Sequence, residues 1–266
     1  MHRSLRLLAV AQASVAAYVD YLQQVDKELL SLYDIFPKTN AMEDVIKFHS
    51  SLCAIMEENA LPLVGIKVLP PSSEAVMALR GTRAVCVPVF SNMFQRGATS
   101  IKKDRLQYVE ATICLEMARL LDECDTVDSA VANTVSFSPG IEVNGSRFPF
   151  YAPTLTALAC DLTGCVNVVK GKDIPMSNEE KLNIVHHRFV LTHNQEPVQV
   201  GGGKHCMDTP FAAVVAAAEY VRAMKAPRKR NLYVFCGGVC SRTPVQAGTY
   251  AFEWGRLGRQ TYSVLP

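Results

Sequence analysis

The feature that most constrains the fold is a change from helical to strand-like periodicity along the chain. Two helical patterns come first, and short apolar runs with strand character follow. The helical stretch from Thr209 to Met224 interrupts the runs, with Thr as N-cap and Pro in its first turn. The strand-like runs are 63–68, 108–117, 134–143, 165–169, 188–193, 231–235 and 249–254. This order predicts an α+β protein in which one helix crosses a mostly β core.

Turn residues separate several of these runs. They are Ser138-Pro139-Gly140, Asn144-Gly145, Asn194-Gln195 and Ala247-Gly248. Each pair or triplet contains a residue type that favours a β-turn, so we expect the chain to reverse direction there.

The first part of the chain is predicted to be helical. Apolar residues recur at helical spacing from Leu5 to Tyr33 and from Met42 to Asn59. We therefore expect a helical N-terminal region, residues 1–60, followed by a β-rich core domain, residues 61–266. Residues 1–19 carry two interpretations of equal weight. Their Arg and Ser content, with no acid before Asp20, is typical of a mitochondrial presequence, and their periodicity fits the first helix of the mature fold.

Composition narrows the class of protein. Of the 266 residues, 49% are hydrophobic and 20% are charged, which is typical of a globular domain. The formal net charge of +2 gives no reason to expect broad nucleic-acid binding. The single basic run, Arg228-Lys229-Arg230, fits a solvated loop, with a contact to RNA or phosphate as the weaker alternative. No apolar run in the sequence is long and uncharged enough to span a membrane.

Cysteine and glycine patterns predict no metal or phosphate motif. The nine cysteines are scattered through apolar segments, which is typical of reduced, buried thiols. Cys236 and Cys240, with His205-Cys206 upstream, lack a second matched pair, so we do not predict a zinc site. Gly201-Gly202-Gly203-Lys204 lacks the P-loop pattern and is interpreted as a close backbone approach near a pocket mouth. His186, His187 and His193 are interpreted as loop or strand-edge residues.

Two carboxylates stand in separate strand-like runs. Glu110 lies in the run 108–117 and Glu142 in the run 134–143. Carboxylates on neighbouring strands indicate a site for a hard cation. A partner on the same strand face as Glu110 would stand two residues later, where the sequence has Thr112. Glu116 lies about 20 Å further along an extended strand, too far to join the site without a sharp bend.

Five motifs occur in the order and near-spacing of the fumarylacetoacetate hydrolase superfamily. They are Gly65-Ile66-Lys67-Val68, Phe90–Met93, Val109–Ala111, Ile141–Arg147 and Gly201–Pro210. Over roughly residues 40 to 265 the chain most resembles the 2-hydroxypenta-2,4-dienoate (2-oxopent-4-enoate) hydratases and the 4-oxalocrotonate decarboxylases. The resemblance implies a rolled, mixed, β-barrel-like sheet with surrounding helices, preceded by a helical region.

The resemblance also implies a particular chemistry. In the family, Mg²⁺ or Mn²⁺ sits on three carboxylates, two of them in a Glu-x-Glu, and holds a 2-keto acid while a lysine and an aspartate assist proton transfer. Lys67 stands at the position of that lysine, Glu110 at the first metal carboxylate and Glu142 at the third. Thr112 stands at the second.

Other positions depart from the family as well. Val85 falls where the acid–base aspartate is expected, Leu162 falls at a polar position within 161–165, and a Leu-Thr-Gly pattern becomes Phe235-Cys236-Gly237. Valine cannot move a proton, and general acid–base assistance is worth ~10²–10⁴-fold in rate. These departures favour a hydratase-like protein with a degraded site and no cofactor, acting as a catalytically inactive structural or assembly subunit. We expect protein partners in a homo- or hetero-oligomeric complex, in the mitochondrion or otherwise in the cytoplasm.

Two alternatives stay open. The protein could be an active Mg²⁺- or Mn²⁺-dependent hydratase, decarboxylase or C–C hydrolase for a small 2-keto acid, using Lys67 with Glu110 and Glu142. It could also be a small-molecule or RNA-binding module that uses the old pocket or the run Arg228–Arg230. Without a metal, the two buried carboxylates need Lys67, Arg147 or backbone donors. A pair between Lys67 and a glutamate is therefore the arrangement we expect.

Overall fold

A computed structural model describes residues 39–95, 108–145, 152–225 and 229–266, together with Val15, Tyr18 and Phe36. Most of the predicted helix from Leu5 to Tyr33, and most of the presequence candidate 1–19, lie outside the described residues. Val15 and Tyr18 are helical and buried, and they belong to the same apolar core as the rest of the described chain.

The elements of the described chain begin with α3 and β1 and end in a run of strands, β9 to β12. The helices are α3 (Met42–Glu58), α4 (Glu74–Ala78), α5 (Val127–Asn133), α6 (Leu155–Cys160), α7 (Asn178–Asn183) and α8 (Pro210–Met224). The strands are β1 (Leu63–Leu69), β2 (Val85–Phe90), β3 (Tyr108–Met117), β4 (Thr134–Asn144), β5 (Cys165–Lys170), β6 (Ile174–Pro175), β7 (Arg188–His193), β8 (Glu196–Gly202), β9 (Tyr233–Cys236), β10 (Thr243–Pro244), β11 (Gly248–Glu253) and β12 (Arg259–Val264).

Two sheets build the core. The larger has the order β2-β1-β9-β3-β4-β5, with β10 added beside β3 and β6 beside β4. Its strands pair in antiparallel fashion except β1 and β9, which run parallel, so the sheet is mixed. The smaller sheet has the order β12-β11-β7-β8. The prediction of an α+β fold with a curled mixed sheet is confirmed.

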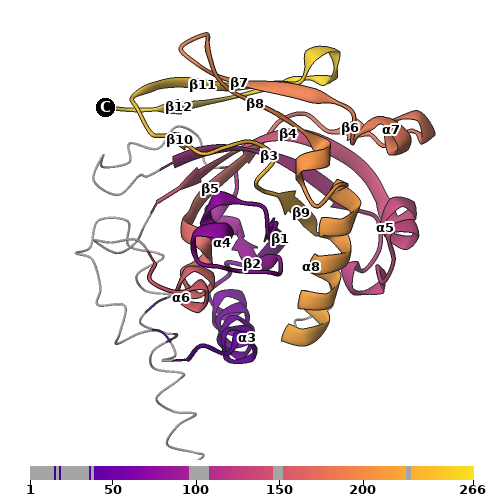
Figure 1. The fold of residues 1–266 in the computed structure, drawn as a ribbon. Helices are drawn as coiled ribbons and strands as arrows, with labels where there is room; N and C mark the ends of the chain where they lie inside the picture. The colour runs from indigo at the N-terminus through magenta and orange to yellow at the C-terminus, as the bar shows by residue number, and fades with distance from the viewer. Residues whose placement is uncertain are drawn as a thin grey trace, which may run out of the picture.

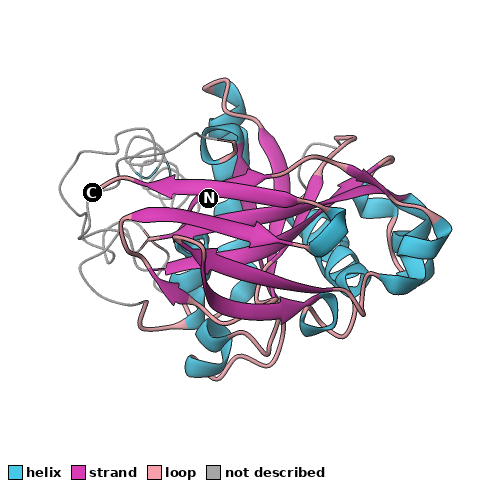
Figure 2. Ribbon diagram, turned by 90° about the horizontal axis from the view of Figure 1, so that it is seen from above, coloured by secondary structure: helices cyan, strands magenta, loops and turns pink. Residues whose placement is uncertain are grey.

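The layers are visible in the two overall views. Figure 1 shows the smaller sheet lying over β3 and β4, with α3, α6 and α8 on the other side of the larger, curled sheet. Seen from above in Figure 2, the strands of the smaller sheet lie across the molecule and the helices surround them. No helix of the described chain is long and apolar enough to cross a membrane.

Helix α8 is formed and positioned as its sequence predicts. The Thr209 hydroxyl caps it by accepting from the Phe211 amide at 3.4 Å, Pro210 opens the first turn, and Lys225 ends it in the left-handed conformation. Its buried alanines allow close packing against β1 and β9. Gly65 allows β1 to lie close to β9, because a Cβ at this position would stand 2.4 Å from the Tyr233 carbonyl oxygen.

One predicted turn lies inside a strand. Ser138-Pro139-Gly140 continues β4 instead of reversing it. Pro139 is opposite Ile113 on β3. On the other edge of β4, Phe137 pairs with β6 and Gly140 pairs with β5, so Pro139 lies between these two pairings. A proline is tolerated there because that side needs no ladder donor from it. The Asn194-Gln195 turn is correct, since both residues have positive φ between β7 and β8.

A buried histidine joins three helices. His49 on α3 has its Nε2 3.0 Å from the Ala159 carbonyl oxygen on α6, and its Nδ1 lies 2.6 Å from the Tyr220 hydroxyl on α8. Burial lowers the pKa of His49 to about 3, against the opposing effect of the Ala159 bond. The neutral ring is therefore part of the core.

The cysteines are free thiols, as the sequence predicts. None of the nine forms a disulfide, and burial raises the pKa of Cys53, Cys86, Cys114 and Cys160 to about 12. Within the described residues no cluster of three or more His, Cys, Asp or Glu side chains is arranged to hold a metal ion.

Candidate functional site

The two predicted carboxylates face each other on neighbouring strands. The antiparallel register of β3 and β4 places Glu110 directly opposite Glu142. Both residues are almost completely buried, with 2% and 0% of their surface exposed. Like charges in directly opposed positions repel, and burial deprives both of water, so the pair requires cations close by.

Lys67 supplies one of these cations. It is fully buried on β1, forms an ion pair with Glu142 and donates to the Asn144 side-chain oxygen at 3.0 Å. Burial raises the pKa of Glu142, the Lys67 charge opposes that rise, and the neighbouring Glu110 charge adds to it. The structure thus contains the lysine–glutamate pair expected from the sequence.

Arg242 supplies the second cation. Its Nε donates to Glu110 Oε1 at 2.5 Å, and its guanidinium also lies 5.2 Å from the centre of the Tyr108 ring. Strand β10 causes this contact, because Thr243 pairs with Val109 and brings Arg242 beside Glu110. The contact of Arg242 with Glu110 was not predicted. The only signal in the sequence was that the two buried carboxylates need Lys67, Arg147 or backbone donors, and Arg147 lies outside the described residues.

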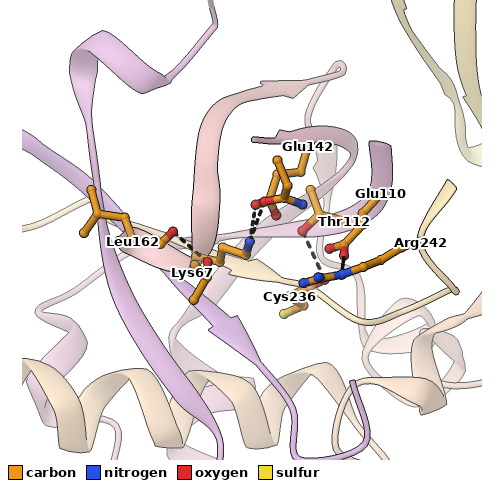
Figure 3. Close-up of polar contacts among 9 residues, drawn as sticks. Lys67, Glu110, Thr112, Glu142, Leu162, Cys236 and Arg242 are labelled. Atoms are coloured by element: carbon orange, nitrogen blue, oxygen red, sulfur yellow. Dashed lines mark hydrogen bonds and ion pairs between the residues drawn. The ribbon is translucent and has the colours of Figure 1, made fainter. Parts of the chain in front are cut away.

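Thr112 stands where the family's second metal carboxylate is expected. It is fully buried on β3, opposite Gly140 of β4. Its hydroxyl donates to the Cys236 carbonyl oxygen on β9 at 3.0 Å, as Figure 3 shows. The hydroxyl proton is therefore used to join two strands, and the side chain adds no negative charge to the site.

The expected acid–base position and the expected polar position within 161–165 both carry aliphatic side chains. Val85 is buried at the start of β2, opposite Leu69 and two residues before Val87, the strand partner of Lys67. Leu162 is buried, and Figure 3 shows it on the Lys67 side of the site. Neither side chain can accept or donate a proton.

The backbone around Leu162 is strained. Leu162, Thr163 and Gly164 have successive φ values of 52°, 55° and 72°, in the left-handed region. Glycine adopts this region freely, but leucine and β-branched threonine do so at a cost. The Thr163 hydroxyl donates to the Leu162 carbonyl oxygen at 2.7 Å and stabilises the turn. The tight turn is thus present, without a polar side chain at position 162.

The donor set does not fit the family's divalent metal. Glu110 Oε2 and Glu142 Oε2 are buried without a hydrogen-bond partner in the described chain, so two oxygens are available. Mg²⁺ requires a near-octahedral shell of hard oxygen ligands, and the third carboxylate is absent at Thr112. Lys67 and Arg242 already neutralise both carboxylates, so a divalent ion would add two uncompensated positive charges in a buried place.

A cleft of about 710 Å³ leads to one end of this cluster. Glu110 and Arg242 line it, together with Ser73, Lys204 and Asp208, whereas Lys67 and Glu142 do not. The Arg242–Glu110 pair therefore lies between the cleft and the buried Lys67–Glu142 pair. The Arg242 Nη2 atom is also buried without a hydrogen-bond partner among the described residues.

Comparisons with solved structures define the fold. The chain resembles 4-oxalocrotonate decarboxylase from Pseudomonas putida G7, solved with magnesium and adipate, at a TM-score of 0.82 and 17% identity, covering 96% of this chain and 97% of that one. It also resembles fumarylpyruvate hydrolase from Pseudomonas aeruginosa, solved with Mn²⁺ and pyruvate, at a TM-score of 0.53 and 11% identity, covering 77% and 91% of the two chains. No protein-family model matches the sequence.

These likenesses establish the class of protein first. The chain has the fumarylacetoacetate hydrolase-like fold, in the form found in 4-oxalocrotonate decarboxylase, so the resemblance drawn from the motifs is confirmed. A sequence relative then defines the family. The chain is 41% identical over 263 residues to REH2-associated factor 2 of Trypanosoma brucei brucei (strain 927/4 GUTat10.1), covering 97% of each. It belongs to the family of that protein.

Proposed function

We propose that this protein is a non-catalytic associated factor, which uses a hydratase-like fold as a scaffold within a protein complex. One observation carries the proposal: both buried carboxylates are neutralised by cations of the chain itself, Lys67 and Arg242. The name of the family relative, which describes an associated factor, supports a role through association. That this protein binds specific protein partners is part of the proposal.

The chemistry of the site supports the absence of turnover. Hydration of a 2-keto acid in this family requires a metal that binds the substrate and groups that move protons. Here Thr112 donates its hydroxyl to a backbone carbonyl, Val85 stands at the acid–base position and Leu162 at the polar position. Loss of an acid–base group alone lowers the rate by ~10²–10⁴-fold.

A metal titration and an activity assay test this proposal together. We expect no heat of binding when Mg²⁺ or Mn²⁺ is titrated into the protein, and no hydration of 2-hydroxypenta-2,4-dienoate. The Pseudomonas putida decarboxylase, which was solved with magnesium, is the positive control for the titration. Turnover that requires a metal and disappears in Glu110→Gln would overturn the proposal and support an active enzyme.

Association is tested directly by purification from the source cell. A tagged full chain should elute with fixed stoichiometry alongside another protein, and treatment with ribonuclease should leave that complex intact. Recovery of the tagged chain alone, at the size of a monomer, contradicts the proposed role. This measurement is independent of the metal titration, so failure of one does not decide the other.

We further propose a mitochondrial location, on the composition of residues 1–19. Val15 and Tyr18 are core residues, and the Tyr18 hydroxyl donates to Asp161 at 3.2 Å. A leader that is removed therefore has to end before Val15. A fluorescent reporter fused to residues 1–19 should enter mitochondria; a reporter that stays in the cytosol contradicts this location.

The basic run gives weaker support for RNA binding than its sequence indicated. Lys229 forms an ion pair with Glu57 of α3, and Arg228 lies outside the described residues. Of the three residues in this run, Arg230 alone is exposed and forms no ion pair with any residue that the structure describes. We therefore keep RNA contact at this run as a secondary hypothesis.

A further inference from the structure

A second, smaller cleft lies beside the first, where β7 begins and β8 ends. Its volume is about 390 Å³. The backbone of Gly201 and Gly202 contributes to its lining, and it shares Lys204 and His205 with the larger cleft. Neither Glu110 nor Glu142 lines this cleft, so the buried carboxylates are not part of it.

The side chains around this cleft are basic. His186, His187, Arg188, Lys204 and His205 line it, and no carboxylate is among its lining residues. His187 is paired with Glu180 at 2.8 Å. Arg188 and Lys204 are exposed, and neither forms an ion pair with any described residue. The cleft therefore holds two uncompensated, permanent positive charges.

The strand register brings these two charges together. Arg188 is the β-ladder partner of Gly202, and Lys204 follows Gly202 by two residues. Two cations held close together in a concave surface create a positive potential that attracts an anion. Nothing in the lining of the cleft neutralises that potential.

The glycines do not form a backbone cradle for phosphate. A Cβ at Gly201 would stand 2.2 Å from the Val239 carbonyl oxygen, and one at Gly203 would stand 2.2 Å from that of Ile184. The amides of Gly202, Gly203 and Lys204 already donate to carbonyl oxygens of the protein. These glycines allow close packing of backbones, so recognition of an anion depends on side chains.

We propose that this cleft binds a phosphate group, held by Arg188 and Lys204, with His186 as a further donor. A guanidinium can donate to two phosphate oxygens at once, and an ammonium can reach a third. His205 is not among the proposed donors, because its Nδ1 donates to the Val239 carbonyl oxygen at 3.1 Å and the Nε2 of the neutral ring is then an acceptor. The cleft exceeds the size of one phosphate, so the group belongs to a larger molecule. This site goes beyond the associated-factor role and does not depend on it.

Calorimetry with tripolyphosphate tests the site. We expect Arg188→Gln/Lys204→Gln to weaken tripolyphosphate binding at least tenfold. Arg230→Gln is the matched control, because Arg230 is exposed and unpaired within the described chain but does not line the cleft; it should change the affinity less than twofold. Citrate, a carboxylate anion, should bind at least tenfold more weakly than tripolyphosphate. Circular dichroism confirms that both variants are folded.

A second probe separates the two sources of phosphate. If the ligand is the backbone of single-stranded RNA, a twelve-residue oligouridylate binds and tripolyphosphate competes with it. The double variant then reduces the slope of log K against log salt by about 1.4, as for two lost phosphate contacts. If the ligand is a phosphorylated small molecule, only tripolyphosphate binds. The proposal is overturned if neither probe binds, if the double variant binds like the wild type, or if citrate binds equally well.

Discussion

Two substitutions should convert the buried cluster into a metal site. At present Lys67 and Arg242 balance Glu110 and Glu142. Thr112→Glu adds a carboxylate on the same strand face as Glu110, opposite Gly140, which has no side chain to obstruct it. Arg242→Ala removes one cation. The double variant then holds three carboxylates and Lys67, a net charge of two negatives that one divalent ion neutralises.

The expected magnitude follows from the burial of Glu110. Its side chain is 3% exposed, so removal of Arg242 leaves a buried charge, which lowers the free energy of unfolding by about 3–5 kcal/mol. Mn²⁺ at a hundred times its dissociation constant would restore about 2.7 kcal/mol. For a chain of this size that corresponds to a rise in Tm on the order of 5–10 °C.

Thermal unfolding followed by circular dichroism, with Mn²⁺ or with EDTA, measures this rise. Each single variant holds one uncompensated negative charge at the site and should show a smaller metal-dependent shift than the double variant. The wild type should show none. The reasoning is refuted if the wild type is stabilised by Mn²⁺ as much as the double variant, or if a folded double variant gains nothing.

Three further predictions concern stability. Burial lowers the pKa of His49 to about 3, so the free energy of unfolding should fall as pH drops below 6.5, by about 2 kcal/mol at pH 5. His49→Gln should reduce this dependence of the free energy of unfolding on pH, measured by urea unfolding, and an unchanged dependence contradicts the assignment. Lys67→Met should lower the free energy of unfolding by about 3–5 kcal/mol, and Lys67→Met/Glu142→Leu should recover most of it; a single-variant loss below about 1 kcal/mol contradicts a buried ion pair. Gly201→Ala should lower it by about 1–3 kcal/mol, and more than Gly202→Ala, whose Cβ would meet backbone only at 3.1 Å; equal effects would show that the close approach is relieved easily.

Strands buried within the sheets were predictable from the sequence, and several edge strands were not. Runs such as 108–117 are long, apolar and rich in β-branched residues, so their period and composition agree. Strand β2 contains Pro88, and β8 begins with Glu196-Pro197, both of which argue against a central strand. Strand β12 begins with polar residues. All three are edges of their sheets, where such residues are tolerated.

The site was only partly predictable for a related reason. Glu110, Glu142 and Lys67 lie within strands whose pairing the motifs implied, and the structure brings all three together. Arg242 reaches Glu110 through the short strand β10, which has two residues and no periodic signal. A contact that depends on such a short pairing across the chain leaves no local pattern in the sequence.

The free cysteines provide a way to observe local opening of the fold. An alkylating reagent reacts with the thiolate, and a thiol with a pKa of about 12 is ionised in only about one molecule in ten thousand at pH 8. Modification in the native state therefore requires the surrounding element to open first. Cys53 on α3, Cys114 on β3 and Cys160 on α6 lie in different elements. Their relative alkylation rates, resolved by mass spectrometry, would rank the order in which these parts of the protein open, using only the native cysteines.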